Sequence, residues 1–445
     1  MTNQTKQTIQ TKQTVDEIVD RALGKQRPSR KQRLRRVDGS SPNMSWPDLT
    51  AKRPARSYRN ARVAIQALGI ICKYDEFHDR MLVGGHQIGQ WAGELSDAVT
   101  VVLRQVIIEN FGFDPGKDHV AEAATALCLE NRFDPLLDYL DGLKWDGVPR
   151  LDRWLTTYLG VEDTNLHRAV GRATLSAAVR RIRQPGCKFD HILTLEGPEG
   201  KGKSTAIAVL AGVENFSDQT ILSQSDKEQQ ELLRGIWLYE IADLAGLRRA
   251  EVEKVKAFAS RTHDRARPAY GRRRVDAPRR CIFVATTNED EYLKSPTGNR
   301  RFWPVAVGSI DIEGLRRDRD QLWAEAAKAE RDGEATTLAA ELWATVADAQ
   351  EARREHDPWD DLLADVAGAV YTSADGMGEE ARISTEELYK THLGIPATEK
   401  VNTVHHQRLK RAMQRLGWNG PKFIGFGGKS QKRGYFRTNR DAEKF

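Results

Sequence analysis

A glycine-rich segment at residues 191–205, HILTLEGPEGKGKST, constrains the fold of this chain more than any other stretch. Apolar and β-branched residues at 192–195 predict a short buried strand, and the apolar run at 205–211 predicts a helix. Between them lies the full G-x-x-x-x-G-K-[ST] spacing, formed by Gly197, Gly202, Lys203 and Ser204. The order strand, loop and helix predicts an α/β fold whose loop binds the phosphates of a nucleoside triphosphate.

Each residue type in this loop has a chemical reason. Glycines let consecutive backbone N–H groups point at phosphate oxygens. Lys203 can neutralise the β- and γ-phosphates, the Ser204 hydroxyl can hold Mg²⁺, and the following helix offers its positive N-terminal end. The expected nucleotide-binding residues are Gly197, Pro198, Glu199, Gly200, Lys201, Gly202, Lys203, Ser204 and Thr205.

Two further strands end in polar residues of the kind that such a site needs. The apolar strand at 236–239 is followed by Glu240, with Asp243 three residues on, and the strand at 281–286 is followed by Thr287 and Asn288. A carboxylate at such a strand end can coordinate Mg²⁺ and orient the attacking water. We expect Glu240 to join Ser204 at the metal, while Asp243 either shares this role or begins the next helix. Asn288 can reach the γ-phosphate or the lytic water.

Arginines dominate the segments on either side of the third strand. Residues 261–280 hold eight arginines and predict a hairpin, and residues 298–304, GNRRFWP, place Arg300 and Arg301 before an aromatic pair. An arginine beside a transferred phosphoryl group stabilises its developing charge. The expected nucleic-acid contacts of the hairpin are Arg265, Tyr270, Arg272, Arg273 and Arg274, because arginines follow phosphates and an aromatic ring stacks on a base.

The net charge is only +6, but the charges are segregated along the chain. Basic residues gather at 21–36, 261–280 and 400–445, whereas residues 311–365 are acidic. This distribution predicts a polyanionic partner that meets particular surfaces, with a set of ordinary solvated charges as the alternative. No run of residues approaches the length of a membrane span, no apolar leader segment is visible at the N-terminus, and the four cysteines lie far apart. We therefore expect a cytoplasmic protein that makes no membrane contact.

The length of 445 residues predicts two or three domains flanked by polar extensions. The expected divisions are a disordered basic tail (1–55), a mainly helical N-terminal adaptor or oligomerisation domain (56–185), the nucleotide-binding core (186–310), a helical cap or linker (311–358) and a C-terminal domain (359–445).

The C-terminal domain should contain helices at 360–371, 383–393 and 403–416, followed by a basic hairpin. This order resembles a winged helix. Its expected DNA contacts include Arg408, Arg411 and Lys432, and a protein-binding domain is the alternative.

Several ordered motifs carry a resemblance to a known family. They are GPEGKGKST, LYEIADLAGL with EVEKVKAF, SRTHDRARPAYGRR, FVATTNEDEYL and GNRRFWPV. Together with upstream strings they resemble the virulence-associated protein E family over residues 58–310. That family belongs to phages, satellites and integrated islands, and is related to superfamily 3 and D5-like helicases of the AAA+ class.

The resemblance implies an AAA+ type core that uses ATP. Residues 197–204 would be Walker A, Glu240 and Asp243 the Walker B acids and Asn288 sensor 1. Arg300 and Arg301 would supply an arginine finger to a neighbouring subunit of a homo-hexamer, and the arginine hairpin would grip DNA in the pore. Walker B departs from the family pattern because a single acid follows the strand, so the roles of Glu240 and Asp243 stay open.

Two functions follow from this resemblance. The first is an ATP-hydrolysing, ring-forming helicase or translocase that acts on single-stranded or forked DNA during replication of a phage or mobile element, with a primase or origin-binding protein as a possible separate partner. The second is a DNA-bound MgATP switch or defence NTPase that oligomerises without unwinding. A small-molecule kinase is a third option, for which the basic segments have no evident purpose.

Overall fold

The computed structural model describes residues 44–266, 274–293, 298–354, 357–372, 379–395, 401–427 and 431–438. The chain forms two compact units, residues 1–354 and 355–445. The second unit begins close to the predicted start of the C-terminal domain at residue 359. Each unit is described by itself.

The centre of the first unit is a parallel sheet, in which five strands pair within the described residues. In chain order these are β7 (Ile192–Glu196), β8 (Phe216–Ser217), β9 (Leu238–Ile241), β12 (Ile282–Thr287) and β13 (Phe302–Ala306). Their spatial order is β13-β7-β12-β9-β8, and every pair is parallel. β7, β9 and β12 are buried along their whole lengths, which explains why their sequences are apolar runs without a polar face.

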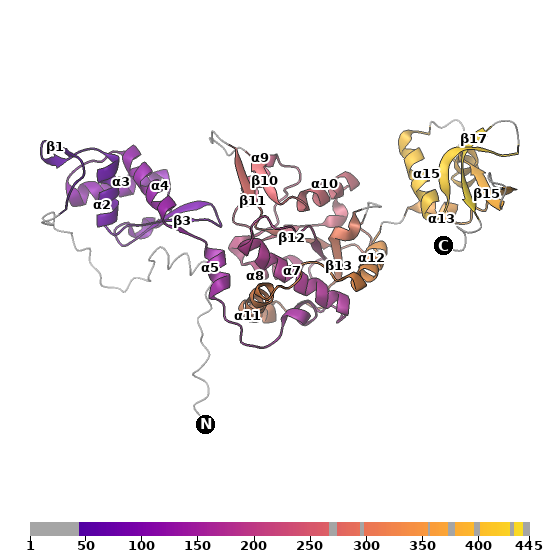
Figure 1. Cartoon of the computed structure of the whole chain (residues 1–445), viewed down its shortest axis with the longest axis horizontal. Coiled ribbons are helices and arrows are strands. Elements are labelled where there is room, and N and C mark those ends of the chain that lie inside the picture. Colours follow the sequence, from indigo (N-terminus) through magenta and orange to yellow (C-terminus); the bar gives the residue numbers. More distant parts are fainter. Residues whose placement is uncertain are drawn as a thin grey trace, which may run out of the picture. The chain divides into compact units, whose positions relative to one another are not determined.

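Helices cover both faces of this sheet. On one face, Leu193 and Leu195 of β7 share a core with α7 (Asn165–Arg183), α8 (Lys203–Ala211) and α11 (Ile312–Arg331). On the other, Ile192 packs in a core with Val252 and Val255 of α10 (Arg249–Ala259). Figure 1 shows α7, α8 and α11 on one side of β12 and α10 on the other. The sheet is thus the middle layer of three, and its carboxyl edge stays open.

The helices before β7 pack on this sheet and not on the N-terminal domain, contrary to the predicted boundary at residue 185. They are α5 (Pro135–Gly142), η2 (Leu151–Arg153), α6 (Trp154–Leu159) and α7. Tyr158 and Val170 lie in the same core as Leu193, and the Tyr139 hydroxyl donates to Asp320 of α11 at 2.7 Å. Helical periodicity shows that such helices have a buried face, but not which neighbour buries it.

The segment predicted as a cap or linker, 311–358, also packs largely against the parallel sheet and its helices. Trp323 of α11 is fully buried, and its indole N–H donates to the Leu210 carbonyl of α8 at 2.9 Å. α12 (Trp343–Glu351) lies against β13, where the Gln350 amide donates to the Phe302 carbonyl at 2.7 Å. Both helices are therefore integral to the first unit.

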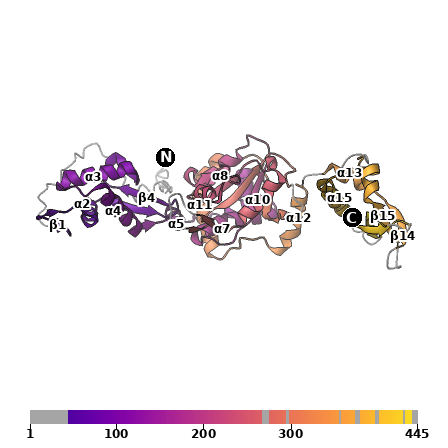
Figure 2. The same ribbon diagram turned by 90° about the horizontal axis from the view of Figure 1, so that it is seen from above.

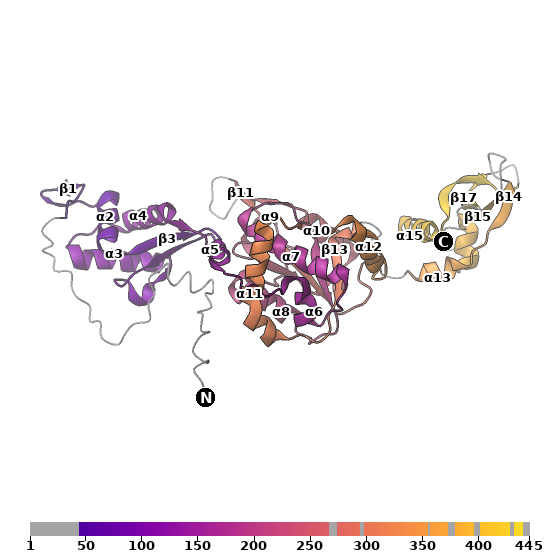
Figure 3. The ribbon, with the colours of Figure 1, turned by 60° about the horizontal axis from the view of Figure 1, so that its bottom comes forward.

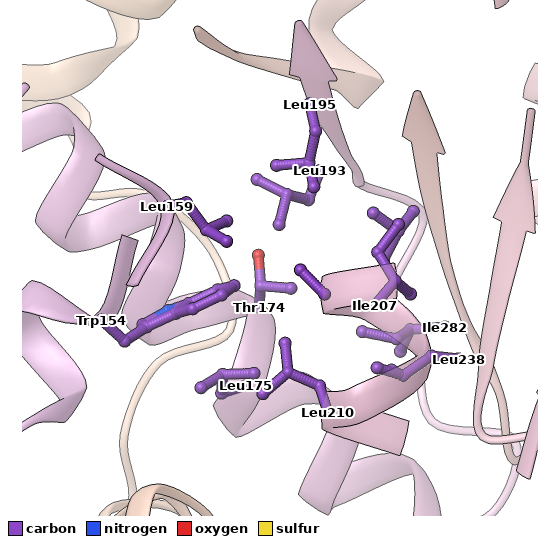
Figure 4. A pocket seen from close by; sticks show the side chains of 12 residues that line it. Trp154, Leu159, Thr174, Leu175, Leu193, Leu195, Ile207, Leu210, Leu238 and Ile282 are labelled. Carbon is purple, nitrogen blue, oxygen red and sulfur yellow. The ribbon is translucent and has the colours of Figure 1, made fainter. Parts of the chain in front are cut away.

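Where α6, α7 and α8 meet β7, the core contains a small void of about 10 Å³. Figure 4 shows Trp154, Leu175, Leu193 and Leu210 around it. The lining is almost wholly apolar, and the Thr174 hydroxyl that borders it already donates to the Val170 carbonyl. A void of this size holds one water molecule at most, so this is a packing defect and not a ligand site.

The N-terminal part of the first unit has its own core. Its strands are β1 (Leu49–Thr50), β2 (Arg53–Pro54), β3 (Ile71–Asp75), β4 (Arg80–Gly84), β5 (Gly93–Glu94) and β6 (Arg132–Phe133), and its helices are α2 (Tyr58–Ala67), η1 (Gly89–Trp91), α3 (Asp97–Phe111) and α4 (Lys117–Glu130). Figure 2 shows α2, α3 and α4 with β4. Folded structure begins before the predicted residue 56, because Trp46 packs edge-on against Phe111 and Phe113. The rest of the predicted tail, residues 1–43, lies outside the described residues.

Shorter elements complete the first unit. They are η3 (Val213–Asn215), α9 (Asp226–Leu232), η4 (Leu244–Gly246), β10 (His263–Ala266), β11 (Val275–Pro278), η5 (Asn299–Arg301) and η6 (Ala340–Leu342). β10 and β11 pair antiparallel, as the predicted arginine hairpin requires.

The second unit joins a four-stranded antiparallel sheet to helices (Figure 3). Its elements are α13 (Pro358–Ala364), β14 (Ala369–Thr372), β15 (Glu379–Ser384), α14 (Thr385–Glu387), η7 (Leu388–His392), α15 (Thr403–Arg415), β16 (Asn419–Gly425) and β17 (Gln431–Thr438). The predicted helix at 360–371 was wrong in its second half, where Gly368 adopts a positive φ of 71° and β14 pairs with β15. A side chain at Gly368 would clash with Trp418 and the Arg382 carbonyl.

Candidate functional site

The candidate site lies at the carboxyl edge of the parallel sheet. There the register aligns Glu196 of β7 with Thr287 of β12, and Ile241 of β9 with Ala285 of β12. Because parallel strands end at the same edge, the loops that follow β7, β9 and β12 meet. The structure thus brings together three segments that are far apart in the sequence.

The loop after β7 has the backbone that its glycines allow. Gly200 and Gly202 have φ of 78° and 88°, a left-handed conformation that residues with a Cβ rarely adopt. Gly202 is the residue immediately before α8, whose first two residues are Lys203 and Ser204. The N-terminal end of α8 therefore opens onto the site, as the motif predicts.

Lys203 is 7% exposed and its partners are neutral oxygens. Its ammonium group donates to the Gly197 carbonyl, to the Pro198 carbonyl at 2.9 Å and to Asn288 Oδ1 at 2.9 Å. Burial lowers the pKa of Lys203, while the nearby carboxylates of Glu240 and Glu199 act in the opposite direction. The predicted Walker A lysine and sensor asparagine are therefore in direct contact.

Glu240, at the third position of β9, is 1% exposed and lies beside residues 197–204, the predicted phosphate loop. Its Oε1 atom accepts from the Ser204 hydroxyl at 2.7 Å and from the Thr286 hydroxyl at 2.6 Å. Its Oε2 atom is buried with no hydrogen-bond partner in the part of the chain that is described. A buried, unpaired carboxylate oxygen next to a serine hydroxyl is a donor set that suits Mg²⁺.

Asp243 lies two residues beyond the end of β9 in a conformation that few residues adopt. Its φ and ψ are 49° and 58°, and its carboxylate accepts from the Gly246 N–H at 3.3 Å. Asp243 is exposed and borders the same cavity as Glu240. The two acids are thus separated by environment, one buried beside Ser204 and the other open to solvent. Left-handed backbone in a non-glycine residue is often found at functional sites.

These side chains border one cavity of about 370 Å³. It is lined by Glu199, Gly200, Lys201, Gly202, Lys203, Ser204, Thr205, Glu240, Ala242, Asp243, Thr286, Thr287 and Asn288. Thr286 was not among the predicted site residues. The polar pair at 286–287, where an apolar strand reaches its end, was the pattern that could have identified it.

Arg300 and Arg301 differ in their exposure and in their contacts. Arg301 donates to the Ser260 hydroxyl at 3.0 Å and lies 3.4 Å from the Asp190 carboxylate. Arg300 is exposed. Both precede β13, whose first residue pairs with Ile192 at the start of β7 and whose last pairs with Glu196. They therefore lie at the edge of the sheet opposite the phosphate loop, roughly 15 Å away at the rise of a strand.

An ion pair that no sequence pattern predicted lies directly before the phosphate loop. Glu196, the residue before Gly197, is 4% exposed. Arg353 donates to its two carboxylate oxygens at 2.9 Å each, and the Tyr292 hydroxyl donates to Oε1 at 2.7 Å. The hydrogen bonds with Glu196 raise the pKa of Arg353. No local pattern connects residues that are 157 positions apart.

Some predicted nucleic-acid contacts lie in the arginine hairpin. Arg265 of β10 lies opposite Asp276 of β11, with the exposed side chains 3.1 Å apart. Arg274 is exposed immediately before β11. Tyr270, Arg272 and Arg273 lie outside the described residues.

In the second unit, Arg408, a predicted DNA contact, is paired with a carboxylate of the same unit. It donates to both carboxylate oxygens of Asp357, at 2.6 and 3.0 Å, and its guanidinium lies 4.3 Å from the centre of the Trp359 ring. Arg411 is half-buried and donates to Gln407 at 3.3 Å. Lys432 is exposed, 3.4 Å from Glu386. Only Lys432 of these three has the exposed ammonium or guanidinium group that the prediction assumed.

Two further observations bear on the site. Among the described residues, no cluster of three or more His, Cys, Asp or Glu side chains is arranged to hold a metal ion by itself. A magnesium site that shares its ligands with nucleotide phosphates needs no such cluster. Within the same residues, no helix combines the length and apolar character that crossing a membrane would require.

Solved structures with a similar course of the chain include three of one protein. The apo structure of the NrS-1 C terminal region (305-718) has a TM-score of 0.47 at 11% identity, covering 84% of this chain and 97% of that chain. The A form apo structure of the same region has a TM-score of 0.45 at 11% identity, with coverages of 86% and 100%. Another A form apo structure has a TM-score of 0.44 at 10% identity, with coverages of 85% and 99%. No curated protein matches the chain.

A family model matches residues 140–355, and it describes the virulence-associated protein E-like domain. The match starts later than the resemblance at residue 58 and ends later than residue 310. It begins within α5 and includes α6, α7, α11 and α12, the helices that pack with the parallel sheet. The residues matched by the family model are thus nearly the same as those that form the parallel sheet and the helices packed with it. Residues 140–355 of this chain are thus a virulence-associated protein E-like domain.

Proposed function

We propose that this chain is an ATP-hydrolysing motor that moves along DNA during replication of a phage or integrated mobile element. The observation that carries the proposal is the meeting of Lys203, Glu240 and Asn288 at the ends of three adjacent parallel strands, around one cavity. A loop with Walker A spacing, a buried acid on its serine and a polar residue between them form a site for hydrolysis of a bound triphosphate.

The order of the strands supports an AAA+ type core. β12, which ends immediately before Asn288, lies between the phosphate-loop strand β7 and the Glu240 strand β9. A side chain that follows β12 therefore lies between the phosphate loop and the acid. This is the place that a sensor residue for the γ-phosphate must occupy.

The residues present fit ATP with Mg²⁺. Ser204 Oγ and Glu240 would hold the ion, because Glu240 Oε2 is buried without a partner and Oε1 already binds the serine. When bound, Mg²⁺ would neutralise the charge of the β- and γ-phosphates. Lys203 would exchange its carbonyl partners for phosphate oxygens, and Asn288, which it already contacts, would then lie beside the γ-phosphate.

We assign the orientation of the attacking water to Asp243 together with Asn288. Asp243 is exposed at the cavity wall, whereas Glu240 is held by two hydroxyl groups. A carboxylate that is open to the cavity can accept a hydrogen bond from the water. This division gives the two acids separate roles, with Glu240 of β9 at the metal and Asp243 beyond β9 at the water.

The position of Arg300 supports a composite site. At the sheet edge opposite its own phosphate loop, it is too far away to contact its own nucleotide. Its exposed guanidinium is instead available to a nucleotide bound by a neighbouring copy, as in the ring of six that the family resemblance implies. We assign the arginine finger to Arg300 and a structural role to Arg301.

DNA is the proposed track. The exposed Arg274 lies between β11 and the segment predicted to enter the pore, whereas Arg265 of β10 pairs with Asp276. In the second unit, the order of helices with β15 paired to β17 and a β16–β17 hairpin supports a winged-helix-like domain. Basic residues on that hairpin give a second contact with DNA.

ATP hydrolysis by the wild-type chain and by Lys203→Ala, each with and without single-stranded DNA, tests the proposal. We expect DNA to stimulate the wild type and Lys203→Ala to lose about 10²–10³-fold in rate, because a charge on the transferred phosphate is no longer compensated. Hydrolysis without strand displacement on a forked duplex would favour the switch alternative. Absence of hydrolysis in the wild type, with magnesium and DNA present, would contradict both.

A further inference from the structure

We propose that a basic pocket in the second unit binds a backbone phosphate of single-stranded DNA while the exposed Phe423 ring stacks on a neighbouring base. This inference rests on the DNA-binding part of the proposed function and assigns it to a particular surface. The pocket has a volume of about 400 Å³. It is lined by Ser384, Thr385, Glu386, Tyr389, Val401, His406, Lys432 and Arg433.

The pocket wall contains a polar group without a partner. Thr385 is 8% exposed, and within the described part of the chain its hydroxyl has no hydrogen-bond partner. Its neighbour Ser384 already accepts from the Glu387 N–H at 3.2 Å, and the Tyr389 hydroxyl pairs with His406 Nδ1 at 3.0 Å. An unsatisfied hydroxyl in an otherwise bonded wall indicates that a ligand or water completes it.

The charge of the pocket favours an anion. Lys432 and Arg433 contribute two positive charges against the single carboxylate of Glu386. Lys432 lies 3.4 Å from Glu386, but both side chains are more than half exposed, so this pair adds little stability and yields readily to a phosphate. Arg433 is exposed, and in the described residues no carboxylate pairs with it. A phosphate diester therefore meets a free guanidinium.

Phe423 adds the contact that selects a single strand. It is 69% exposed on β16, directly opposite Arg433 of β17 in the hairpin register. Directly opposed residues of an antiparallel pair project from the same face, so the ring and the guanidinium lie side by side. An exposed aromatic ring beside cations stacks on an unpaired base, which a duplex keeps inside its own stack.

The face of α15 is a poorer candidate for the same ligand. Arg408 and Arg415 both donate to carboxylates on or next to α13, those of Asp357 and Asp360. A phosphate would have to break these pairs before it could bind there. The hairpin pocket offers its cations without that cost.

Fluorescence anisotropy of a labelled oligo(dT) strand with the full-length chain, without nucleotide, tests this site. We expect Phe423→Leu to weaken binding about 5- to 150-fold, the loss of one stacked base, and Phe423→Tyr to bind like the wild type. Arg433→Ala should reduce the slope of log affinity against log salt by about 0.7, the value for one phosphate contact on a single strand. Val370→Ala is the matched control, because Val370 is 64% exposed on β14 at the other edge of the same sheet.

The outcomes separate this inference from the proposed function. Wild-type affinity in Phe423→Leu, or an equal loss in Phe423→Leu and Val370→Ala, would overturn the stacking site. An equal loss of duplex and single-strand binding in Phe423→Leu would also overturn it. If Phe423→Leu binds like the wild type and DNA still stimulates ATP hydrolysis, the motor stands and this surface is wrong. If the wild type neither binds oligo(dT) nor responds to it, both proposals fail.

Discussion

The phosphate loop and the helix α15 both present basic side chains, but they differ in what those side chains bind. Lys203 donates to two carbonyl groups and to the Asn288 amide oxygen, all of them uncharged. Arg408 and Arg415 of α15 donate to the carboxylates of Asp357 and Asp360. The charge of Lys203 is therefore available to a phosphate, whereas the charges of Arg408 and Arg415 are already paired with carboxylates.

This difference has a simple energetic basis. A hydrogen bond between two opposite charges adds a Coulombic attraction that a bond from an ammonium group to a neutral carbonyl lacks. A phosphate that displaces neutral carbonyl partners thus gains a stronger bond, whereas one that displaces a carboxylate gains nothing and leaves an anion unpaired. We infer that the partner of a basic residue, more than its position on a helix or loop, tells whether it acts on a phosphate. The rule assigns Arg300 to catalysis and Arg301, which lies beside Asp190, to structure.

The largest expected effect comes from Arg300. We expect Arg300→Ala to lower ATP hydrolysis about 10³- to 10⁵-fold, the range known for arginine fingers. Arg301→Ala should lose far less activity and instead reduce stability, because it removes the contacts with Ser260 and Asp190. Steady-state hydrolysis together with chemical denaturation of both variants measures the contrast.

Mixing two inactive variants tests whether Arg300 acts on a neighbouring copy. Arg300→Ala keeps an intact phosphate loop, and Lys203→Ala keeps an intact finger. In a ring, some mixed interfaces combine both intact halves, so the mixture should regain hydrolysis that neither variant has. A mixture as inactive as its components would contradict action in trans.

The next largest effect concerns the ion pair directly before the phosphate loop. Among the residues that the structure describes, Arg353→Ala leaves Tyr292 as the one remaining hydrogen-bond partner of the buried Glu196 carboxylate. We expect a loss of about 2–4 kcal/mol in the free energy of unfolding, somewhat below a fully buried pair because Arg353 is partly exposed. Urea denaturation measures this loss. Arg354→Ala, whose partner Glu351 is mostly exposed, should cost less than about 1 kcal/mol.

The phosphate loop and the second unit also show what the sequence could and could not predict. The loop, its glycines and the contact of Lys203 with the end of β12 follow from local spacing and from the rule that parallel strands end together. The Glu196–Arg353 pair and the Arg408–Asp357 pair join residues 157 and 51 positions apart, and no local pattern connects them. Likewise, an apolar helix face announces burial, but α5, α6 and α7 could be placed on the sheet only once their partners were known.

A pH titration sharpens the comparison further. The lowered pKa of Lys203 means that its ammonium group loses its proton at a pH below the ordinary 10.5 of a lysine. A bound triphosphate raises that pKa again, so nucleotide binding takes up a proton in this alkaline range. Affinity should be constant below the lowered pKa and fall above it by up to about tenfold per pH unit. Lys203→Arg is the control, because arginine stays charged and its affinity should not change with pH there.

The smallest expected effect gives the most direct test of the inference that a carboxylate partner marks a structural arginine. Arg408→Ala should lower the stability of the second unit by about 1 kcal/mol, since it removes a partly exposed ion pair and a contact with the Trp359 ring. Its affinity for oligo(dT) should stay within about twofold of the wild type, whereas Arg433→Ala should show the reverse pattern of unchanged stability and weaker binding. If Arg408→Ala binds DNA poorly while its denaturation curve stays unchanged, a carboxylate partner does not mark a structural arginine. The surface of α15 would then bind DNA as its sequence predicted, with Asp357 serving to hold Arg408 ready for a phosphate.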